Sequence, residues 1–318
     1  MVISLDFELS WGVRDFLEVN PAYAANIEGE GKAVRSILRL FEEFEVAATW
    51  ATVGLVFAES AEQARAFQPV VLPDYDNPAL SPFGELTDET SNGSQWFAPN
   101  LIDEIRDTPR QEVATHTFSH YYCRESGQTA EAFAADITSA KAIAEQHDIA
   151  LKAIVFPRNQ HNPAYDDILA ENGISCYRGN QRARMYQFDG PTLNNKFYRM
   201  SRLLDTYFNV SGKNTFGWGD LKNGNLINVP ASIFLRPVKT ASGTLQNLQF
   251  RRIAKSMMDA ARNNRLFHLW WHPHNFGVNL EQNLTFLTRV LNEYSGLRER
   301  YGMLSLTMSE VANRVEAE

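Results

Sequence analysis

Two histidines, His116 and His120, lie four residues apart in the stretch ATHTFSH at 114–120. Closely spaced imidazoles are typical ligands of zinc in proteins. The pair does not match the zinc-binding helix motif H-E-x-x-H, because Thr117 stands where that motif has glutamate. The spacing alone is therefore compatible with a metal site or with two hydrogen-bonded loop histidines. A metal site needs a third ligand.

A third ligand is available at the end of the first expected strand, VISLDFE at 2–8. Side chains alternate along a strand, so Asp6 and Glu8 share one face. By themselves they are equally compatible with a solvated strand end. Two neutral imidazoles and one carboxylate make the open site of a hydrolytic zinc ion, with the fourth position left for water. The combination favours a divalent metal ion, with zinc as the expected ion.

Further polar side chains follow two other expected strands. Arg158 follows LKAIVFP at 151–157, and His272 and His274 follow LFHLWW at 266–271. In parallel α/β folds, catalytic groups gather at the carboxyl ends of the strands. Taken singly, the arginine could be a surface charge and the histidines could be spacers around a proline. Their joint occurrence at strand ends favours a single site.

These strand ends belong to a regular alternation along the chain. Short apolar runs alternate with segments of helical period. Such an alternation implies a parallel sheet with right-handed crossovers, either as a barrel or as an open doubly wound sheet. We expect one domain over 1–318, with loop insertions near 67–98 and 178–225. The expected strands are 2–8, 47–54, 112–117, 151–157, 174–177, 226–234 and 266–271, and the expected helices are 31–44, 129–146, 163–173, 196–208, 250–264 and 281–297.

Composition excludes several classes of partner. The net charge of −8 over 318 residues argues against a nucleic-acid or anionic-membrane partner. No window reaches the roughly 20 apolar residues of a membrane span. No signal-peptide pattern opens the sequence, and Cys123 and Cys176 are expected to be reduced thiols, so we expect a cytoplasmic location. The glycine-rich and lysine-containing nucleotide-binding motifs are absent.

Five stretches together resemble the polysaccharide deacetylases, the metal-dependent carbohydrate esterases with a NodB-like homology domain. SLDFE resembles their first, acidic motif, ATWATVG the strand after their first helix, and THTFSH their H-[ST]-x-x-H signature. FPRNQ resembles the arginine-bearing motif and LWWHPH the histidine-bearing last motif. The matches run in the expected order from residue 2 to residue 274. The resemblance implies an α/β fold, a distorted (β/α) barrel of about seven parallel strands.

The resemblance also implies roles for individual residues. Asp6 matches the general base, and Glu8, His116 and His120 match the metal ligands. Arg158 matches the residue that orients the base, and His272 matches the general acid. Trp11, Tyr121 and His274 are expected to contact substrate.

The sequence departs from the family pattern in three places. The second acid of the first motif is usually aspartate, so the longer Glu8 leaves an exchange of roles with Asp6 open. The third motif reads PRNQ and lacks the usual glycine or tyrosine. Trp218 and Asp220 are the only candidates for a fourth motif.

The expected function is removal of an N- or O-acetyl group from a sugar or glycan precursor by a metal-dependent hydrolase. Two alternatives stay open: allantoinase-like hydrolysis of a small cyclic amide, and a catalytically inactive glycan-binding barrel. A cytoplasmic location would favour a soluble precursor, such as an N-acetylated nucleotide sugar or monosaccharide, over a wall polymer. The sequence leaves the sugar, the metal and the oligomeric state open.

Overall fold

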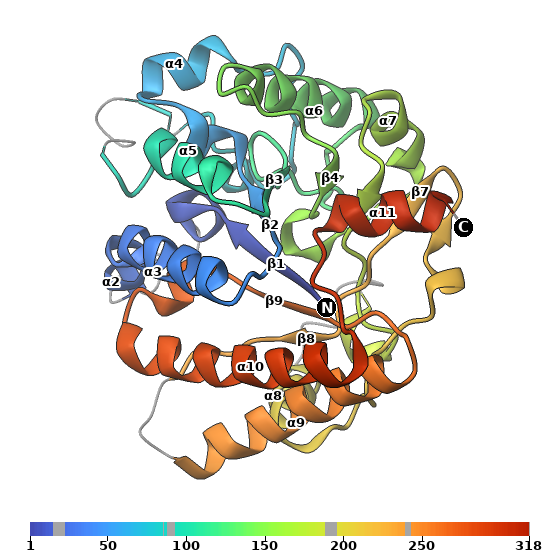
Figure 1. Cartoon of the computed structure of the whole chain (residues 1–318). Coiled ribbons are helices and arrows are strands. Elements are labelled where there is room, and N and C mark those ends of the chain that lie inside the picture. The colour runs from blue at the N-terminus through green and yellow to red at the C-terminus, as the bar shows by residue number, and fades with distance from the viewer. Residues whose placement is uncertain (15–22, 85, 88–92, 188–195, 239–242, 318) are drawn as a thin grey trace.

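A computed structural model describes residues 1–14, 23–84, 86–87, 93–187, 196–238 and 243–317. These residues form one continuous sheet with helices packed around it (Figure 1). The strands of the sheet, in spatial order, are β6 (Lys222–Asn223), β7 (Leu226–Asn228), β5 (Cys176–Tyr177), β4 (Ala153–Ile154), β3 (Gln111–Thr115), β2 (Ala48–Thr52), β1 (Val2–Phe7), β9 (His268–Trp271) and β8 (Ile233–Phe234).

All neighbouring pairs in this sheet are parallel except β6 and β7. The sheet is strongly curled into a half-barrel. Arg178, which follows β5, bonds to Asp6 of β1 although three strands separate β5 from β1. This contact requires that the strands wrap around a common interior. The α/β fold with a distorted parallel barrel is therefore confirmed.

One extended stretch links the two sides of the curl. Val229 and Ala231 donate their backbone N–H groups to Tyr177 and Gly179, beyond β5, at 2.8 and 2.9 Å. The next residue, Ser232, donates to His268 at the start of β9 at 2.8 Å. The predicted strand 226–234 thus becomes β7 and β8. Together with the unpredicted short strand β6, this division gives nine strands in the described residues, where the sequence predicted about seven.

The side chains of β1 alternate between two environments, as the period of a strand requires. Ile3, Leu5 and Phe7 belong to the main hydrophobic core, beneath the helices. Val2 belongs to a second cluster inside the curl, so Asp6, four residues further on, also faces the interior. All six residues of β1 are buried.

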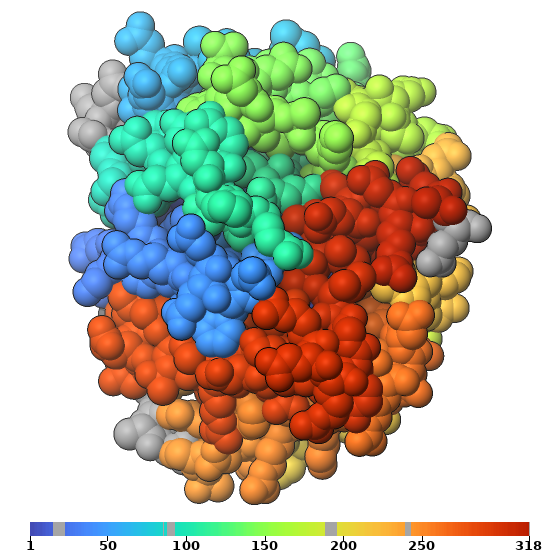
Figure 2. Space-filling model, viewed as in Figure 1, coloured from blue at the N-terminus to red at the C-terminus, as the bar shows by residue number. Residues whose placement is uncertain are grey.

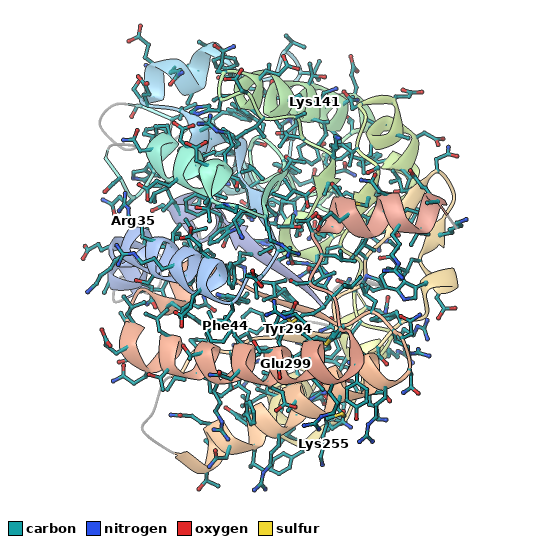
Figure 3. All side chains as sticks on the ribbon, in the orientation of Figure 1. Arg35, Phe44, Lys141, Lys255, Tyr294 and Glu299 are labelled. Carbon is teal, nitrogen blue, oxygen red and sulfur yellow. The ribbon has the colours of Figure 1, made fainter. Side chains whose placement is uncertain are left out.

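The helices pack around this curled sheet. Figure 2 shows α3, α10 and α11 covering the face of the molecule that it presents, and Figure 3 labels Phe44 and Tyr294 where α3 and α10 meet. The helices are α2 (Ala24–Glu28), α3 (Glu30–Glu43), α4 (Ala61–Ala66), α5 (Pro99–Asp107), α6 (Ala130–Glu145), α7 (Asp166–Glu171), α8 (Lys196–Phe208), α9 (Gly243–Arg262), α10 (Leu280–Tyr301) and α11 (Met308–Ala317). None of the described helices is long and apolar enough to cross a membrane.

The last helix corrects one expectation. The sequence predicted 281–297 as the closing helix, but α10 runs on to Tyr301 and α11 follows it. Val311 and Val315 of α11 pack into the interior cluster. The backbone N–H of Met308 donates to Thr49, near the amino end of β2, at 2.9 Å. Helix α11 therefore closes the amino-terminal end of the half-barrel and leaves the carboxyl ends of the strands for a site.

The predicted insertions pack against this frame. In the described part of 67–98, the carbonyl of Trp96 accepts a 2.7 Å hydrogen bond from the indole of Trp11. Tyr75 accepts a 2.9 Å bond from the backbone of Tyr122. The first insertion therefore supports the segment that carries the paired histidines. The second, 178–225, contains the predicted helix as α8.

Candidate metal centre

Three side chains converge at the carboxyl ends of β1 and β3. The Nε2 atoms of His116 and His120 lie 3.5 and 3.3 Å from Oε2 of Glu8. One ligand atom from each of the three residues lies within 4.8 Å of the other two, and all three side chains are buried. The predicted ligand set is thus brought together by the fold.

The other nitrogen of each imidazole is already engaged. His116 Nδ1 lies 2.8 Å from the carbonyl of Val155, so it must donate and leave Nε2 with a lone pair. His120 Nδ1 lies 3.1 Å from the hydroxyl of Tyr122. Hydrogen bonds of this kind fix the tautomer and the orientation of a ligating imidazole.

The charge states also fit a divalent cation. Burial lowers the pKa of His120 to about 4, although Glu8 acts to raise it. Burial alone would raise the pKa of Glu8, but the charge of His272 and the adjacent imidazoles of His116 and His120 hold it well below its usual range. An anionic carboxylate beside a neutral imidazole is the form in which these groups bind a metal. The donor set therefore fits a divalent ion.

The segment that carries the two histidines has an unusual backbone. Thr117 and His120 have φ angles of 65° and 58°. Asp136 of α6 accepts hydrogen bonds from the backbone N–H groups of Phe118 and Ser119 at 2.6 and 3.1 Å, and also binds the Ser119 hydroxyl. Non-glycine residues rarely adopt such angles, and they persist where surrounding contacts over-determine them. The buried carboxyl of Asp136 supplies those contacts.

Asp6 belongs to a different part of the interior. Its two carboxylate oxygens accept hydrogen bonds from Nη1 and Nη2 of Arg178 at 2.6 and 2.8 Å. The Arg178 guanidinium lies 4.1 Å from the centre of the Trp270 ring, and it also binds Ser4 and Asn159. Burial alone would raise the pKa of Asp6, but Arg178, together with His116 and His272, lowers it. Asp6 is therefore held as a carboxylate in a fixed orientation.

This pairing corrects the arginine chosen from the sequence. Arg158 was expected to orient Asp6, but Arg178 fills that position. The Arg158 guanidinium lies 4.2 Å from the centre of the Tyr122 ring and 4.0 Å from a carboxylate oxygen of Glu125. Arg158 also has a positive φ of 52°. The strand ISCY at 174–177 ends directly before Arg178, so the strand-end rule applied to that strand would have found it.

His272 lies between the two acids and the solvent. Its Nε2 is 3.7 Å from Asp6 Oδ2 and 3.7 Å from Glu8 Oε1. Its side chain is 25% exposed, whereas those of the two acids are 4% exposed. It lines a cavity of about 870 Å³, together with Phe234 and Trp270. The predicted acid therefore stands where a substrate would meet the buried carboxylates.

The three expected substrate contacts do not line this cavity. His274 is 2% exposed, and its Nδ1 lies 4.0 Å from both Glu8 and Glu30. Trp11 is fully buried, and its aromatic neighbours are Trp96 and Phe97. Tyr121 is 1% exposed, and its hydroxyl bonds to the carbonyl of Thr129 at 2.9 Å. These aromatic rings support the site from behind, which corrects the expectation.

The fourth-motif candidates also lie elsewhere. Asp220 forms an exposed ion pair with Arg182 at 3.0 Å. Trp218 packs beside the interior cluster that contains α11, under the guanidinium of Arg314. Neither belongs to the converging ligand group.

Comparisons with known proteins identify the fold. No family model matches the chain, and no curated protein matches it in sequence. Among solved structures, a Mycobacterium smegmatis protein assigned as a polysaccharide deacetylase has a TM-score of 0.58 at 12% identity, covering 99% of this chain and 90% of that one. A Pseudomonas aeruginosa PAO1 protein with the same assignment has a TM-score of 0.55 at 11% identity, over 100% of this chain and 91% of that one.

The PuuE allantoinase is as similar, with a TM-score of 0.55, 12% identity and coverage of 99% and 90% of the two chains. The chain therefore has the fold that polysaccharide deacetylases and this allantoinase share. Within that fold, it carries a buried glutamate and two histidines that fit a metal ion.

Proposed function

We propose that this protein is a metal-dependent hydrolase that removes an acetyl group from an amino sugar or a glycan precursor. The observation that carries the proposal is the convergence of Glu8, His116 and His120 beside the Asp6–Arg178 pair. His272, which lines the cavity, lies 3.7 Å from both acids. Zinc is the proposed ion, because two imidazoles and one carboxylate form a typical hydrolytic zinc site.

The bound ion would polarise the substrate carbonyl and make water a better nucleophile. Asp6 is ionised, so it can accept a proton from the attacking water. Arg178 binds both oxygens of Asp6, which prevents the carboxylate from rotating out of position. Pre-organisation of this kind spares the reaction the cost of orienting the base.

His272 is the proposed general acid. It lines the cavity while its Nε2 lies 3.7 Å from Asp6, so it could donate a proton to the leaving nitrogen while Asp6 holds the proton taken from water. Two proton-transfer groups with separate tasks are of no use to a protein that only binds glycans. Their retention therefore argues for an enzyme.

The size of the cavity favours a sugar derivative over a small cyclic amide. About 870 Å³ lies within the range of pockets for drug-sized ligands and greatly exceeds a ring of allantoin size. The equal similarity to an allantoinase makes ureide hydrolysis the competing activity. A direct comparison of the two substrate classes separates them.

The test is an acetate-release screen of metal-loaded protein over N-acetyl and O-acetyl sugars, with allantoin assayed in parallel. We expect acetate from at least one sugar. We also expect His272→Ala to lower kcat roughly 10²–10⁴-fold at unchanged metal content. Hydrolysis of allantoin without acetate release would favour the competing activity. If the protein catalyses neither reaction, the enzyme proposal has no support.

A further inference from the structure

One end of the cavity carries a group of arginines in a protein whose net charge is −8. Arg202 comes from α8, Arg236 follows β8, and Arg252 comes from α9. The carboxylate of Asp205 lies among them. Three cations from three elements, with one anion between them, leave this end of the cavity positive.

Arg252 and Asp205 form the fixed base of this group. The Arg252 guanidinium binds the Asp205 carboxylate through Nη2 at 2.8 Å and the Asp205 carbonyl through Nε at 2.5 Å. Asp205 also accepts hydrogen bonds from Tyr186 and from Ser211, both at 2.8 Å. Arg252 is 4% exposed, and its Nη1 has no hydrogen-bond partner among the described residues. A buried guanidinium N–H without a partner leaves positive charge unmatched at the wall of the cavity.

Arg236 is the most available cation of the group. Its Nε donates to the hydroxyl of Thr206 at 2.8 Å, and its backbone carbonyl accepts from Gln249 at 3.1 Å. Within the described parts of the chain it forms no ion pair with a carboxylate. Burial lowers the pKa of the neighbouring Arg202, and the positive charges of Arg236 and Arg199 lower it further. Like charges held together in this way repel each other, and a bound anion would relieve the repulsion.

The group lies at the same mouth as His272. Phe234 of β8 is in register with Trp270 of β9, and Arg236 and His272 each stand two residues further along. The Phe234 ring centre lies 5.9 Å from that of His272 and 6.0 Å from the Arg236 guanidinium carbon. One aromatic ring, on which a sugar could pack, therefore separates the acid from the cation.

We propose that Arg236 and Arg252 bind an oxyanion of the substrate, a phosphate ester or a carboxylate, while the acetyl group lies at Glu8, His116 and His120. The planar guanidinium fork matches both oxyanions. This inference rests on the proposed function and narrows its substrate class to acidic N-acetyl or O-acetyl sugars. It also assigns Arg236 as the residue that selects charged sugars over neutral ones.

Calorimetric titration of the metal-loaded protein tests the proposal. The probes are N-acetylglucosamine 1-phosphate, N-acetylmuramic acid and uncharged N-acetylglucosamine. At least one charged sugar should bind about tenfold or more tightly than N-acetylglucosamine. Tighter binding of N-acetylglucosamine 1-phosphate identifies a phosphate ester as the group that the site recognises. Tighter binding of N-acetylmuramic acid identifies a carboxylate.

Arg236→Gln should weaken binding of the preferred charged sugar about ten- to hundredfold, because a charge-assisted hydrogen bond is lost. Binding of N-acetylglucosamine should change by less than about twofold. Arg236→Lys keeps the charge but loses the planar guanidinium fork. Its affinity for the charged sugar should lie between those of the wild-type protein and Arg236→Gln. The matched control is Arg251→Gln, which removes the same charge from an exposed position of α9 next to Arg252 and should change neither affinity.

Two results would overturn the inference. One is equal binding of charged and uncharged sugars by the wild-type protein. The other is an equal loss of both on Arg236→Gln. Acetate release is measured on the same samples, so a failure of the anion-site proposal can be distinguished from a failure of the deacetylase proposal. Selective binding without acetate supports the anion site and contradicts the deacetylase, whereas acetate release without charge selectivity does the reverse.

Discussion

Asp6 and Glu8 are two acids on the same face of one strand, equally buried, yet their surroundings assign them different tasks. Asp6 is bonded at both oxygens by Arg178, so its negative charge already has a cationic partner, and its remaining lone pairs can accept a proton. Glu8 forms no such pair with an arginine or lysine among the described residues, and its nearest imidazoles are those of His116 and His120, at 3.5 and 3.3 Å. On this difference we base the proposal that Glu8 is the metal ligand and Asp6 the base.

Amide substitutions test this division. Asp6→Asn should keep about one metal ion per chain and lower turnover roughly 10²–10⁴-fold, because the general base is lost. Glu8→Gln should lose most of the metal, because an uncharged amide is a poor ligand for zinc. Elemental analysis and acetate release measure the two effects. Loss of metal from the first variant and not from the second would mean that Asp6 is the ligand.

The buried ion pair between Arg178 and Asp6 leads to a prediction about stability. Arg178→Met should destabilise the protein by about 3–5 kcal/mol, because it leaves the Asp6 carboxylate buried without its partner. Combining it with Asp6→Asn should recover much of that loss, because no buried charge then remains unpaired. Chemical denaturation of the two single variants and the double variant measures this coupling.

Arg158→Met is the matched control for that cycle. Arg158 is one-third exposed and lies over the Tyr122 ring, so its loss should cost about 1 kcal/mol or less. If Arg158→Met proves the more damaging substitution, the assignment of Arg178 as the partner of Asp6 is incorrect.

Residues on strands or directly at their ends could be predicted from the sequence, and His120 from its spacing to His116, whereas the surroundings of other loop residues could not. The two-residue period placed Asp6 and Glu8 on one interior face, and the structure agrees. Trp11 and Tyr121 lie outside strands, where no period tells whether an aromatic ring faces a cavity or the core. Arg178 directly follows the predicted strand 174–177 and could have been found by the strand-end rule, but the resemblance of FPRNQ to an arginine-bearing motif pointed to Arg158.

At the scale of elements, the ligand segment after β3 depends on α6. Asp136 of α6 fixes the backbone of Phe118 and Ser119, between the two histidines. Sequence reasoning placed 129–146 as a helix and 112–117 as a strand, but the contact between them is tertiary. Asp136 lies among alanines in a helix, and nothing in the local sequence indicates which segment its side chain contacts.

Asp136→Asn should lower the affinity for the metal about 10- to 100-fold, as is usual for groups that orient ligands. The substitution keeps the shape and replaces one acceptor oxygen with an N–H donor that faces the donors of Ser119. Metal affinity is measured by competition with a chelator. The control is Glu145→Gln, an exposed position on the same helix, which should leave the affinity unchanged.

The pH dependence of stability distinguishes Asp136 further. Burial raises its pKa to about 6 from 3.8, although Ser119 and Phe118 donate hydrogen bonds that lower it. The folded state thus prefers the protonated acid, and this contribution is lost as pH rises from about 4 to about 6. Metal-free Asp136→Asn should lose less stability than the wild-type protein over that interval. An identical pH profile would show that Asp136 is not buried as described.

At the scale of the whole molecule, one end of the half-barrel is sealed and the other carries the chemistry. Helix α11 closes the amino ends of the strands (Figure 1). The cavity is lined by residues that include Trp270 and His272, at the carboxyl end of β9. The alternation of strands and helices predicted this architecture, because it depends on local period. The curvature that brings β5 to β1 was not predictable from local pattern, because it arises from contacts such as that between Arg178 and Asp6.

The same scaffold in polysaccharide deacetylases and an allantoinase implies that the fold alone does not choose the substrate. The choice falls to the walls of the cavity, which come largely from loops, the second insertion with its helix α8 among them, and include Arg252 of α9. The proposed metal ligands come from the end of β1 and the segment after β3, in the centre of the sheet. Metal binding should therefore report on the integrity of the whole fold.

Removal of the metal should lower the thermal stability of the entire protein. The ligands join the end of β1 to the segment after β3, so an ion bound only by the folded chain stabilises it by mass action, about 4.1 kcal/mol at a thousandfold excess over Kd. Treatment with a chelator should lower Tm by several degrees, and added zinc should restore it. His120→Ala is the control, because without that ligand the Tm should respond to neither chelator nor zinc. An equal response in both proteins would place the stabilising ion elsewhere and leave the Glu8, His116 and His120 site without support.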